Sequence, residues 1–228
     1  MAISVVVGGS NGLGRVIAQR LFDRGDTVVI TSRSQERAAA VAAELGDTAR
    51  GIAVDLSRPS TIAESLAGVT SVDNLVITAI DQGVNSLKAF NIEHAVAAIT
   101  TKLVGYTETV RVLRPHFTPA ASVVLFGGLA KERPYPGSTM VTTFNAGVSG
   151  LVKTLAAEIA PHRVNAVHPG VVGDSPKWRA VANHPAIART PIGRLVTMAE
   201  VADATEFLLR NGGVNAHDLF VDGGIQVT

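Results

Sequence analysis

Short runs of apolar residues alternate along the chain with longer segments in which apolar residues recur every three to four positions. The short runs are typical of strands, and the longer segments are typical of helices that bury one face. Because the strands are apolar at nearly every position, we expect both faces of their sheet to be covered. The pattern therefore predicts one doubly wound α/β domain over residues 1–228. We expect strands at residues 5–7, 26–31, 50–54, 72–77, 122–126, 163–168 and 218–221, and helices after residue 14 and at 34–45, 91–113, 138–160 and 198–210.

A glycine-rich turn joins the first strand to the first helix. The order of strand, turn and helix is the one that holds a dinucleotide, although glycine-rich turns are also ordinary loops. Gly8 permits the tight turn, Gly12 lets a phosphate approach the backbone, and Gly14 lets the helix pack closely on the sheet. The free N–H groups at the helix start would face a diphosphate. We assign contacts with this group to Gly8, Ser10, Asn11, Gly12, Leu13 and Gly14.

The second predicted strand ends in a basic rather than an acidic residue. Dinucleotide folds that select NAD place Asp or Glu there to bind the ribose hydroxyls, whereas Ser32 and Arg33 offer a hydroxyl and a guanidinium. These groups favour the 2′-phosphate of NADP, and a solvent-exposed arginine is the alternative. At the next strand end, Asp55-Leu56 is a candidate contact for the adenine amino group, or Asp55 caps the helix that opens near Pro59.

Composition narrows the class of protein. With 46% hydrophobic residues, 17% charged residues and a net charge of +1, the 228-residue chain is neither a disordered tail nor an electrostatic nucleic-acid binder. It has no cysteine, which excludes disulfide and thiolate chemistry, and we assign no metal site. The N-terminus enters a strand without a basic leader or cleavage site, and no apolar run reaches membrane-spanning length. We therefore expect a soluble cytoplasmic protein that acts on a small molecule and binds neither nucleic acid nor membrane.

The stretch 173–193 is long for a loop in a compact domain. It holds three prolines, one histidine and the only tryptophan, Trp178. These features indicate a lid or a substrate-binding segment.

Taken with the glycine turn, three further motifs resemble the short-chain dehydrogenase/reductase family along nearly the whole chain. They are Asp55-Leu56, the run from Glu158 to Gly170 and Val221-Asp222-Gly223-Gly224. The resemblance implies a seven-stranded Rossmann sheet with a nicotinamide cofactor across the carboxyl ends of the strands. It also implies a homodimer or homotetramer whose main contact is formed by the long helices around Lys102 and Asn145. Further cofactor contacts implied by the resemblance are Thr78, Ala79, Ile80, Lys102, Asn145, Pro169, Gly170 and Val172.

The catalytic set of the family does not carry over. Family members have Asn on the long helix before strand five, Ser after that strand, and Tyr and Lys four residues apart on the next helix. By the surrounding residues, these positions hold Lys102, Gly128 (or Gly127), Val141 and Asn145. Valine has no titratable proton and glycine has no side-chain donor, so the usual proton relay is absent. Loss of a positioned general acid typically costs a factor of about 10² to 10⁴ in rate.

Asn and Lys have changed places in this alignment, so one ammonium and one amide remain in the predicted pocket. We hypothesise that Lys102 reaches the space near the nicotinamide ribose and that Asn145 keeps a hydrogen bond there. Relocation of a charge preserves the field that a developing alkoxide needs; sequence drift is the alternative. Glycine in place of serine is expected to widen the pocket near the nicotinamide.

Five other side chains are candidate proton donors, each with a simpler alternative. Tyr106 shares a helix face with Lys102 and is expected to pack in the core or at an interface. Tyr135 lies between two prolines and is expected at the surface. His168 can cap its strand end, and Thr142 and Thr143 can bond to the preceding helical turn.

The sequence thus favours an NADP(H)-dependent oxidoreductase that transfers hydride to a carbonyl, an imine or an activated alkene. The proton would come from Lys102, from water or from the substrate itself. An NADP(H)-binding sensor, scaffold or partner subunit without turnover is the main alternative, because all four catalytic positions are changed. A redox-neutral isomerisation or elimination is a third.

Overall fold

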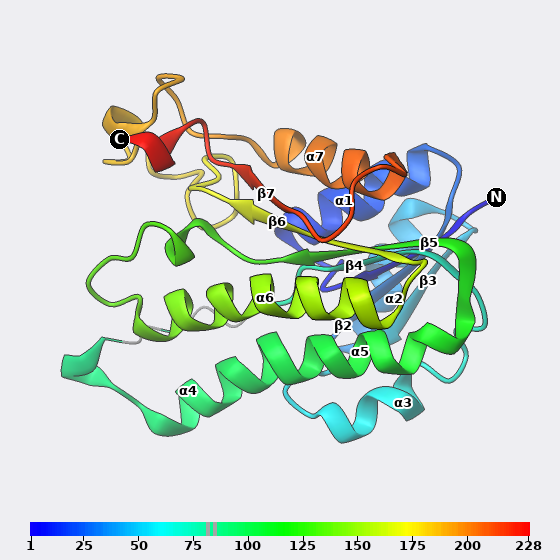
Figure 1. Ribbon diagram of the computed structural model, residues 1–228. Helices are drawn as coiled ribbons and strands as arrows, with labels where there is room; N and C mark the ends of the chain where they lie inside the picture. Colours follow the sequence, from blue (N-terminus) through cyan, green and yellow to red (C-terminus); the bar gives the residue numbers. More distant parts are fainter. Residues whose placement is uncertain (81–82, 84–85) are drawn as a thin grey trace.

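The computed structural model describes residues 1–80, 83 and 86–228, and its centre is a seven-stranded parallel sheet (Figure 1). The strand order is β3-β2-β1-β4-β5-β6-β7, so the direction of winding reverses between β1 and β4. Ligands of doubly wound sheets bind at the carboxyl ends of the strands beside such a reversal. The predicted seven-stranded Rossmann architecture is confirmed. The strands are β1 (Ile3–Val7), β2 (Thr27–Ser32), β3 (Ala49–Ala53), β4 (Val72–Ile77), β5 (Phe117–Phe126), β6 (Arg163–Pro169) and β7 (Asp218–Val221).

Helices cover both faces of the sheet, which explains why its strands are apolar at successive positions. Val5 and Val7 of β1 pack in one core with α3, α5 and α6, whereas Val6 packs in the opposite core with α1, α2 and α7. Figure 1 shows α1 and α7 together on one side and α3 to α6 on the other. The helices are α1 (Gly12–Asp23), α2 (Gln35–Leu45), α3 (Ile62–Ser65), α4 (Ile92–Ile99), α5 (Gly105–Leu113), α6 (Thr139–Glu158) and α7 (Met198–Arg210).

The predicted long helix at 91–113 contains a π-helical segment, η3 (Thr100–Val104), between α4 and α5. Such segments are often found at functional sites. The hydrophobic periodicity of the sequence does not reveal it, because the segment adds a single wide turn within a continuous helix. Lys102 lies in this segment and is buried.

Strand β5 begins at Phe117, earlier than the predicted start at 122. Pro119 and the exposed Ala120 interrupt the apolar pattern in its first half. Proline lacks the N–H that a central strand must donate. Accordingly, the register with β4 shifts between Val72 and Asn74. Along the described residues, no helix is both long enough and apolar enough to cross a membrane.

Candidate cofactor and catalytic site

The turn after β1 has the backbone geometry that requires glycine. Gly8 has φ +84° and Gly12 has φ +52°, both in the left-handed region. A Cβ on Gly14 would lie 2.2 Å from the carbonyl oxygen of Gly8, so only glycine allows α1 to pack this close to the strand end. Asn11 caps α1, its Oδ1 accepting from Gly12 N at 2.8 Å. The first turn of α1 carries no acidic residue. Its N-terminus is therefore suited to an anion.

The segment after β4 packs against this turn. Thr78 Oγ1 donates to the carbonyl oxygens of Val7 and Gly8, at 3.1 and 3.3 Å. A Cβ on Gly8 would lie 2.9 Å from the backbone nitrogen of Ala79. The structure therefore brings two groups of predicted cofactor contacts together at the point where the winding reverses. The other predicted contacts lie at the same edge of the sheet or just beyond it: Ile80 after β4, Pro169 at the end of β6, and Gly170 and Val172 in the following segment.

The ends of β2 and β3 carry the predicted 2′-phosphate and adenine contacts. Ser32 is buried, and its Oγ accepts from Ser34 N at 3.4 Å. Arg33 is exposed. Asp55 accepts from the backbone and hydroxyl of Ser57, at 3.0 and 2.7 Å, so it stabilises its own turn. Leu56 is buried in the core.

Lys102 lies directly beneath the carboxyl ends of β4 and β5. Its Nζ donates to Tyr106 Oη at 3.0 Å, and that hydroxyl donates to the carbonyl oxygen of Ala79 at 2.8 Å. The same hydroxyl lies 3.4 Å from the carbonyl oxygen of Phe126. Burial lowers the pKa of Lys102 to about 7 and raises that of Tyr106 well above its usual value. This lysine can thus gain or lose a proton near neutral pH, and Tyr106 is a core residue, one of the two expected roles.

Asn145 is also buried, and its Oδ1 has no hydrogen-bond partner among the described residues. A Cβ on Gly128 would lie 2.8 Å from Asn145 Nδ2. A Cβ on Gly127 would lie 2.2 Å from Nδ1 of His168. The expectation that these glycines widen the pocket is wrong, because an amide and an imidazole fill the space that side chains on Gly127 and Gly128 would need.

His168 does more than cap its strand end. Its Nδ1 accepts from Gly128 N at 3.1 Å, and its Nε2 lies 3.0 Å from Asp218 Oδ1 on β7. Sequence analysis missed this pair. The signal was present as two polar residues, His168 and Asp218, within apolar strands, but the register between β6 and β7 was needed to bring them together.

The remaining candidate donors are one exposed tyrosine and two threonines that donate to backbone carbonyls. Tyr135 is exposed, as expected. Thr143 Oγ1 donates to the carbonyl oxygen of Thr139 in the preceding helical turn, also as expected. Thr142 Oγ1 instead donates to the carbonyl oxygen of Ala130, at 3.0 Å.

The segment 173–193 is fixed at its base and reaches the glycine turn. Gly173 N donates to the carbonyl oxygen of Val196 at 2.9 Å, and Asp174 Oδ1 accepts from Met198 N at 2.8 Å. A Cβ on Gly12 would lie 3.8 Å from Pro176 Cδ. The segment therefore packs beside the predicted diphosphate site.

Comparisons with known proteins identify the family. A family model described as enoyl-(acyl carrier protein) reductase matches residues 7–226. The chain belongs to the short-chain dehydrogenase/reductase family of oxidoreductases. It is 30% identical to the 3-oxoacyl-[acyl-carrier-protein] reductase of Mus musculus and 29% identical to carbonyl reductase family member 4 of Danio rerio, with 99% of this chain and 98% of each relative covered.

Solved structures of short-chain dehydrogenases/reductases have the same fold. A 3-ketoacyl-(acyl-carrier-protein) reductase from Brucella melitensis, complexed with NADH, superposes with a TM-score of 0.88 at 26% identity. The superposition covers 99% of this chain and 98% of that chain.

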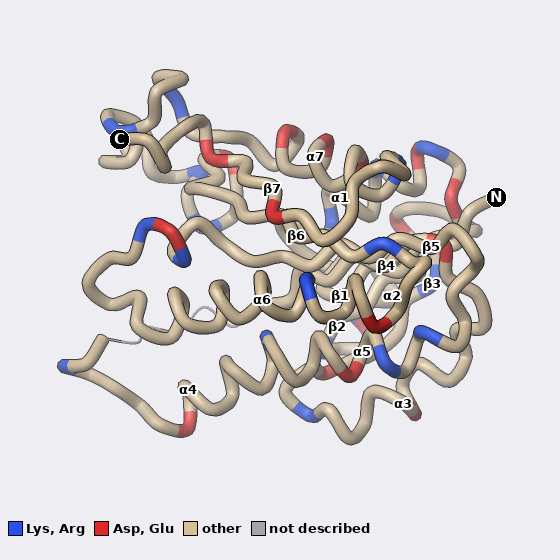
Figure 2. Tube along the Cα trace, viewed as in Figure 1, with Lys and Arg blue, Asp and Glu red and all other residues tan. Residues whose placement is uncertain are grey.

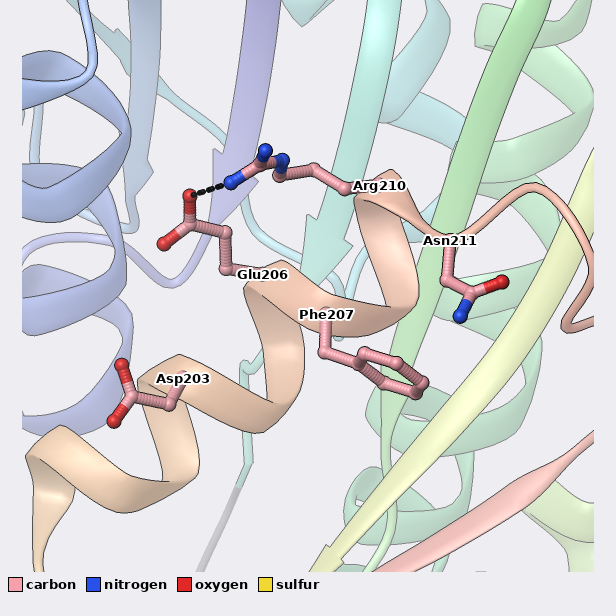
Figure 3. Close-up of a pocket in the computed structure, with 5 residues that line it drawn as sticks. All are labelled: Asp203, Glu206, Phe207, Arg210 and Asn211. Atoms are coloured by element: carbon pink, nitrogen blue, oxygen red, sulfur yellow. Dashed lines mark ion pairs between the residues drawn. The ribbon is translucent and has the colours of Figure 1, made fainter.

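Figure 3 shows a surface hollow of this short-chain dehydrogenase/reductase that is lined by residues of α7 and the residue that follows it. It lies along the second half of α7, where Arg210 pairs with Glu206 at 3.6 Å. Arg163, the first residue of β6, donates to the carbonyl oxygens of Leu208 and Leu209. The end of α7 thus lies at the opposite edge of the sheet, so this hollow is separate from the candidate cofactor site. The lining residues are Asp203, Glu206, Phe207, Arg210 and Asn211. Within the described ranges, no cluster of His, Asp and Glu forms a metal site.

Proposed function

We propose that this protein is an NADP(H)-dependent reductase that acts on a carbonyl, an imine or an activated alkene, with Lys102 as the source of the proton. The observation that carries the proposal is the buried Lys102 Nζ, linked through Tyr106 to the carbonyl of Ala79 at the cofactor edge. An amine whose pKa is about 7 is an acid of useful strength at neutral pH. The names of two relatives, a carbonyl reductase family member and a 3-oxoacyl-[acyl-carrier-protein] reductase, support a carbonyl substrate, and the family model's description as an enoyl-(acyl carrier protein) reductase supports an activated alkene.

The residues at this edge fit a nicotinamide dinucleotide phosphate. Helix α1 begins at Gly12, and its first turn carries no carboxylate. The N-terminus of this helix therefore favours a diphosphate. Arg33 is exposed at the end of β2, where its guanidinium is available to a 2′-phosphate. Asn145 Oδ1 has no partner among the residues that the structure describes, so it suits a ribose or substrate hydroxyl, because a buried acceptor without a donor is costly.

The bound cofactor would supply the hydride, and the chain would supply the proton. In the proposed step, Lys102 Nζ gives one proton to the substrate oxygen, directly or through one water, and becomes a neutral amine. For an activated alkene, the proton goes instead to the carbon next to the activating group. While it is charged, the ammonium stabilises negative charge on that oxygen in apolar surroundings. Tyr106 keeps its own proton on the carbonyl of Ala79 and orients the amine.

Residues 173–193 are proposed as the lid of this site. Their base is tied to Val196 and Met198, and Pro176 packs near Gly12. The packing of Pro176 near Gly12 supports a role for the segment in shielding a diphosphate from water.

Turnover with a panel of aldehydes, ketones, 3-oxoacyl thioesters, imines and enones tests the proposal. We expect NADPH to be consumed and kcat to fall as the pH rises above about 7, the pKa of Lys102. Lys102→Met is expected to lower kcat by a factor of about 10² to 10⁴ while NADPH still binds. Lys153→Met, which changes an exposed lysine of α6, is the matched control. NADPH binding without turnover of any compound would overturn the assignment as a reductase, and full activity of Lys102→Met would overturn the role of Lys102.

An NADP(H)-binding sensor, scaffold or partner subunit is the second candidate. It is favoured by the absence of a side-chain hydroxyl at Gly128 and Val141, the positions aligned with the family's serine and tyrosine. This candidate predicts tight NADPH binding, no turnover and capture of a specific partner in a pull-down. The turnover panel therefore separates the two.

We further propose a homodimer or homotetramer built on α5 and α6. An apolar groove lies between these helices and is lined by Leu103, Thr107, Gly147, Gly150 and Leu151, among other residues. The only charged residues of α6 are Lys153 and Glu158, both in its C-terminal half (Figure 2). Such a surface suits a helix pair from a second copy. A cytoplasmic location is part of the same proposal.

A further inference from the structure

A chain of buried and half-buried polar groups lies behind the Gly127–Gly128 turn. His168 is fully buried, and its two ring nitrogens contact Gly128 N at 3.1 Å and Asp218 Oδ1 at 3.0 Å. The second carboxylate oxygen of Asp218 lies 3.1 Å from Lys131 Nζ. The contacts thus run from Gly128 through His168 and Asp218 to Lys131. Because Lys131 lies only three residues after Gly128, both ends of this series lie at the same turn.

The partners of His168 determine which ring nitrogen carries the proton. Gly128 N is a donor, so Nδ1 must present its lone pair, and Nε2 then carries the proton toward Asp218. Partial burial raises the pKa of Asp218, but hydrogen bonds, led by that of His168, outweigh it and lower the pKa well below its usual value. The carboxylate therefore stays ionised and fixes the Nε2–H tautomer.

The imidazole is also held sterically. Phe220 of β7 stacks on it with ring centroids 5.0 Å apart, and Lys131 Nζ lies 5.0 Å from the centroid of Phe220. On the other side, a Cβ on Gly127 would lie 2.2 Å from His168 Nδ1. Gly127 N donates to the carbonyl oxygen of Val167 at 2.9 Å. Both amides of the turn are thus fixed, one by the backbone of β6 and one by the side chain of His168.

We propose that His168, held by Asp218 and Lys131, is a positioning residue that fixes the Gly127–Gly128 turn and through it the amide of Asn145. Gly128 and Asn145 are in close contact, so a displaced turn would displace the amide. The assignment of this turn to the substrate pocket rests on the proposed function, whereas the tautomer and the contacts of His168 can be tested without it.

Three substitutions test separately the contact of His168 with Gly128 and its contact with Asp218. In His168→Asn, Oδ1 can replace the Nδ1 acceptor, but the link to Asp218 is lost. In His168→Gln, a donor toward Asp218 is kept, but the acceptor for Gly128 is lost. Asp218→Asn preserves volume but removes the negative charge that contacts Lys131, and its Oδ1 can still accept from Nε2–H. Glu132→Gln is the control, because Glu132 contacts Lys131 at 2.8 Å, whereas the ring nitrogens of His168 contact Gly128 and Asp218.

Nitrogen-15 NMR of the imidazole and hydrogen exchange of the Gly128 amide give readouts that need no substrate. We expect a protonated Nε2 and an unprotonated Nδ1 in the wild type, in Glu132→Gln and in Asp218→Asn, because the Gly128 amide requires an acceptor in all three. Exchange of the Gly128 amide should be about tenfold faster in His168→Gln than in His168→Asn, since only the former lacks an acceptor. A proton on Nδ1 in the wild type, or equal exchange in the two variants, would overturn the inference.

Kinetics then show whether the turn acts on substrate. With a substrate from the panel, kcat should fall about tenfold in His168→Gln, and much less in His168→Asn and Asp218→Asn, while the KM for NADPH changes less than about twofold. A purely structural role would instead lower the Tm of all three variants and leave kcat equal in the two His168 variants, which would contradict a positioning role. If no compound is reduced, the proposed function fails, but the tautomer and exchange results still decide the inference.

Discussion

The amide of Asn145 occupies the space that a side chain on Gly128 would need. A Cβ on Gly128 would lie 2.8 Å from Asn145 Nδ2, a distance that forces one of the two to move. The two residues lie on different elements, Gly128 after β5 and Asn145 within α6. Glycine at 128 and asparagine at 145 therefore form a matched pair.

This pairing predicts a coupled loss of stability. Gly128→Ala should cost about 1–3 kcal/mol of unfolding free energy through overpacking. In an Asn145→Ala background, most of that cost should disappear, because the obstructing amide is gone. A double-mutant cycle from urea unfolding measures the coupling. Gly212→Ala is the control, since a Cβ there meets nothing within 4 Å. Additive effects of the two substitutions would contradict the pairing.

Because Lys102 is buried, we expect the free energy of unfolding to rise with pH. Its pKa is about 7 in the folded protein and 10.5 in the unfolded chain, so between these values the unfolded state binds more protons. The destabilising contribution is complete below pH 7 and is lost as the pH rises toward 10.5. Lys102→Met should therefore be more stable than the wild type by on the order of 1–4 kcal/mol at neutral pH, with a difference that shrinks toward pH ~9.5. Urea unfolding across this range tests the slope.

Lys153→Met is the control for the pH dependence of the unfolding free energy, because Lys153 is exposed on α6. Its stability should follow the wild type at every pH. A pH-independent difference between Lys102→Met and the wild type would show that the ammonium is not desolvated in the folded protein. The expected pH dependence of kcat is opposite to that of stability. As the pH rises above about 7, kcat should fall while the free energy of unfolding rises.

Arg33 predicts the choice between the two dinucleotides. Arg33→Ala should raise the Kd for NADPH by about 10- to 100-fold, the effect of losing a charge-assisted contact with a phosphate. The Kd for NADH should stay unchanged, because NADH lacks the 2′-phosphate. Fluorescence titration with both dinucleotides measures the ratio. Arg111→Gln, an exposed arginine of α5, is the control. An equal change for both dinucleotides would remove Arg33 from this role.

The sequence predicts the sheet well because its signal is local. Each strand is a short apolar run, and the conformation required of Gly8 and Gly12 follows from the turn itself. The contacts of the candidate site are not local. The pairing of His168 with Asp218 depends on the register of β6 and β7, and that of Gly128 with Asn145 depends on how α6 packs beside β5.

The surroundings of Lys102 also depend on contacts that the local sequence does not predict. The resemblance to the family predicts an exchange of Lys and Asn between two helices, but it does not predict the hydrogen bond from Lys102 to Tyr106. A π-helical turn within a continuous helix leaves no mark in the hydrophobic periodicity. The direction of that side chain, and the burial that lowers its pKa, therefore emerge only from tertiary packing.

Arg163 is expected to stabilise the end of α7. Its guanidinium donates to the carbonyl oxygens of Leu208, Leu209 and Val214, at 2.7, 2.6 and 3.2 Å. Helix C-termini leave such carbonyls without partners, and a cation there is favourable. Arg163→Gln should lower the unfolding free energy by about 1.5–3 kcal/mol. Arg111→Gln should change the unfolding free energy by less than about 0.5 kcal/mol, because the Arg111 side chain that pairs with Glu108 is 67% exposed. If Arg163→Gln and Arg111→Gln changed the unfolding free energy equally, the contacts of Arg163 with the end of α7 would add no stability.

Gly150 provides a test of the proposed subunit contact. It is an exposed residue of α6 that lines the groove between α5 and α6, and a Cβ on it meets nothing within 4 Å. Gly150→Arg should therefore fold normally, and it should favour the helix slightly because glycine is a weak helix former. If a second copy covers this groove, a buried, unpaired guanidinium would cost several kcal/mol. Light scattering coupled to gel filtration should then show a shift to a smaller species. Gly212→Arg, also open to solvent, should leave the oligomer unchanged. An unchanged mass for Gly150→Arg would place the contact elsewhere on the protein.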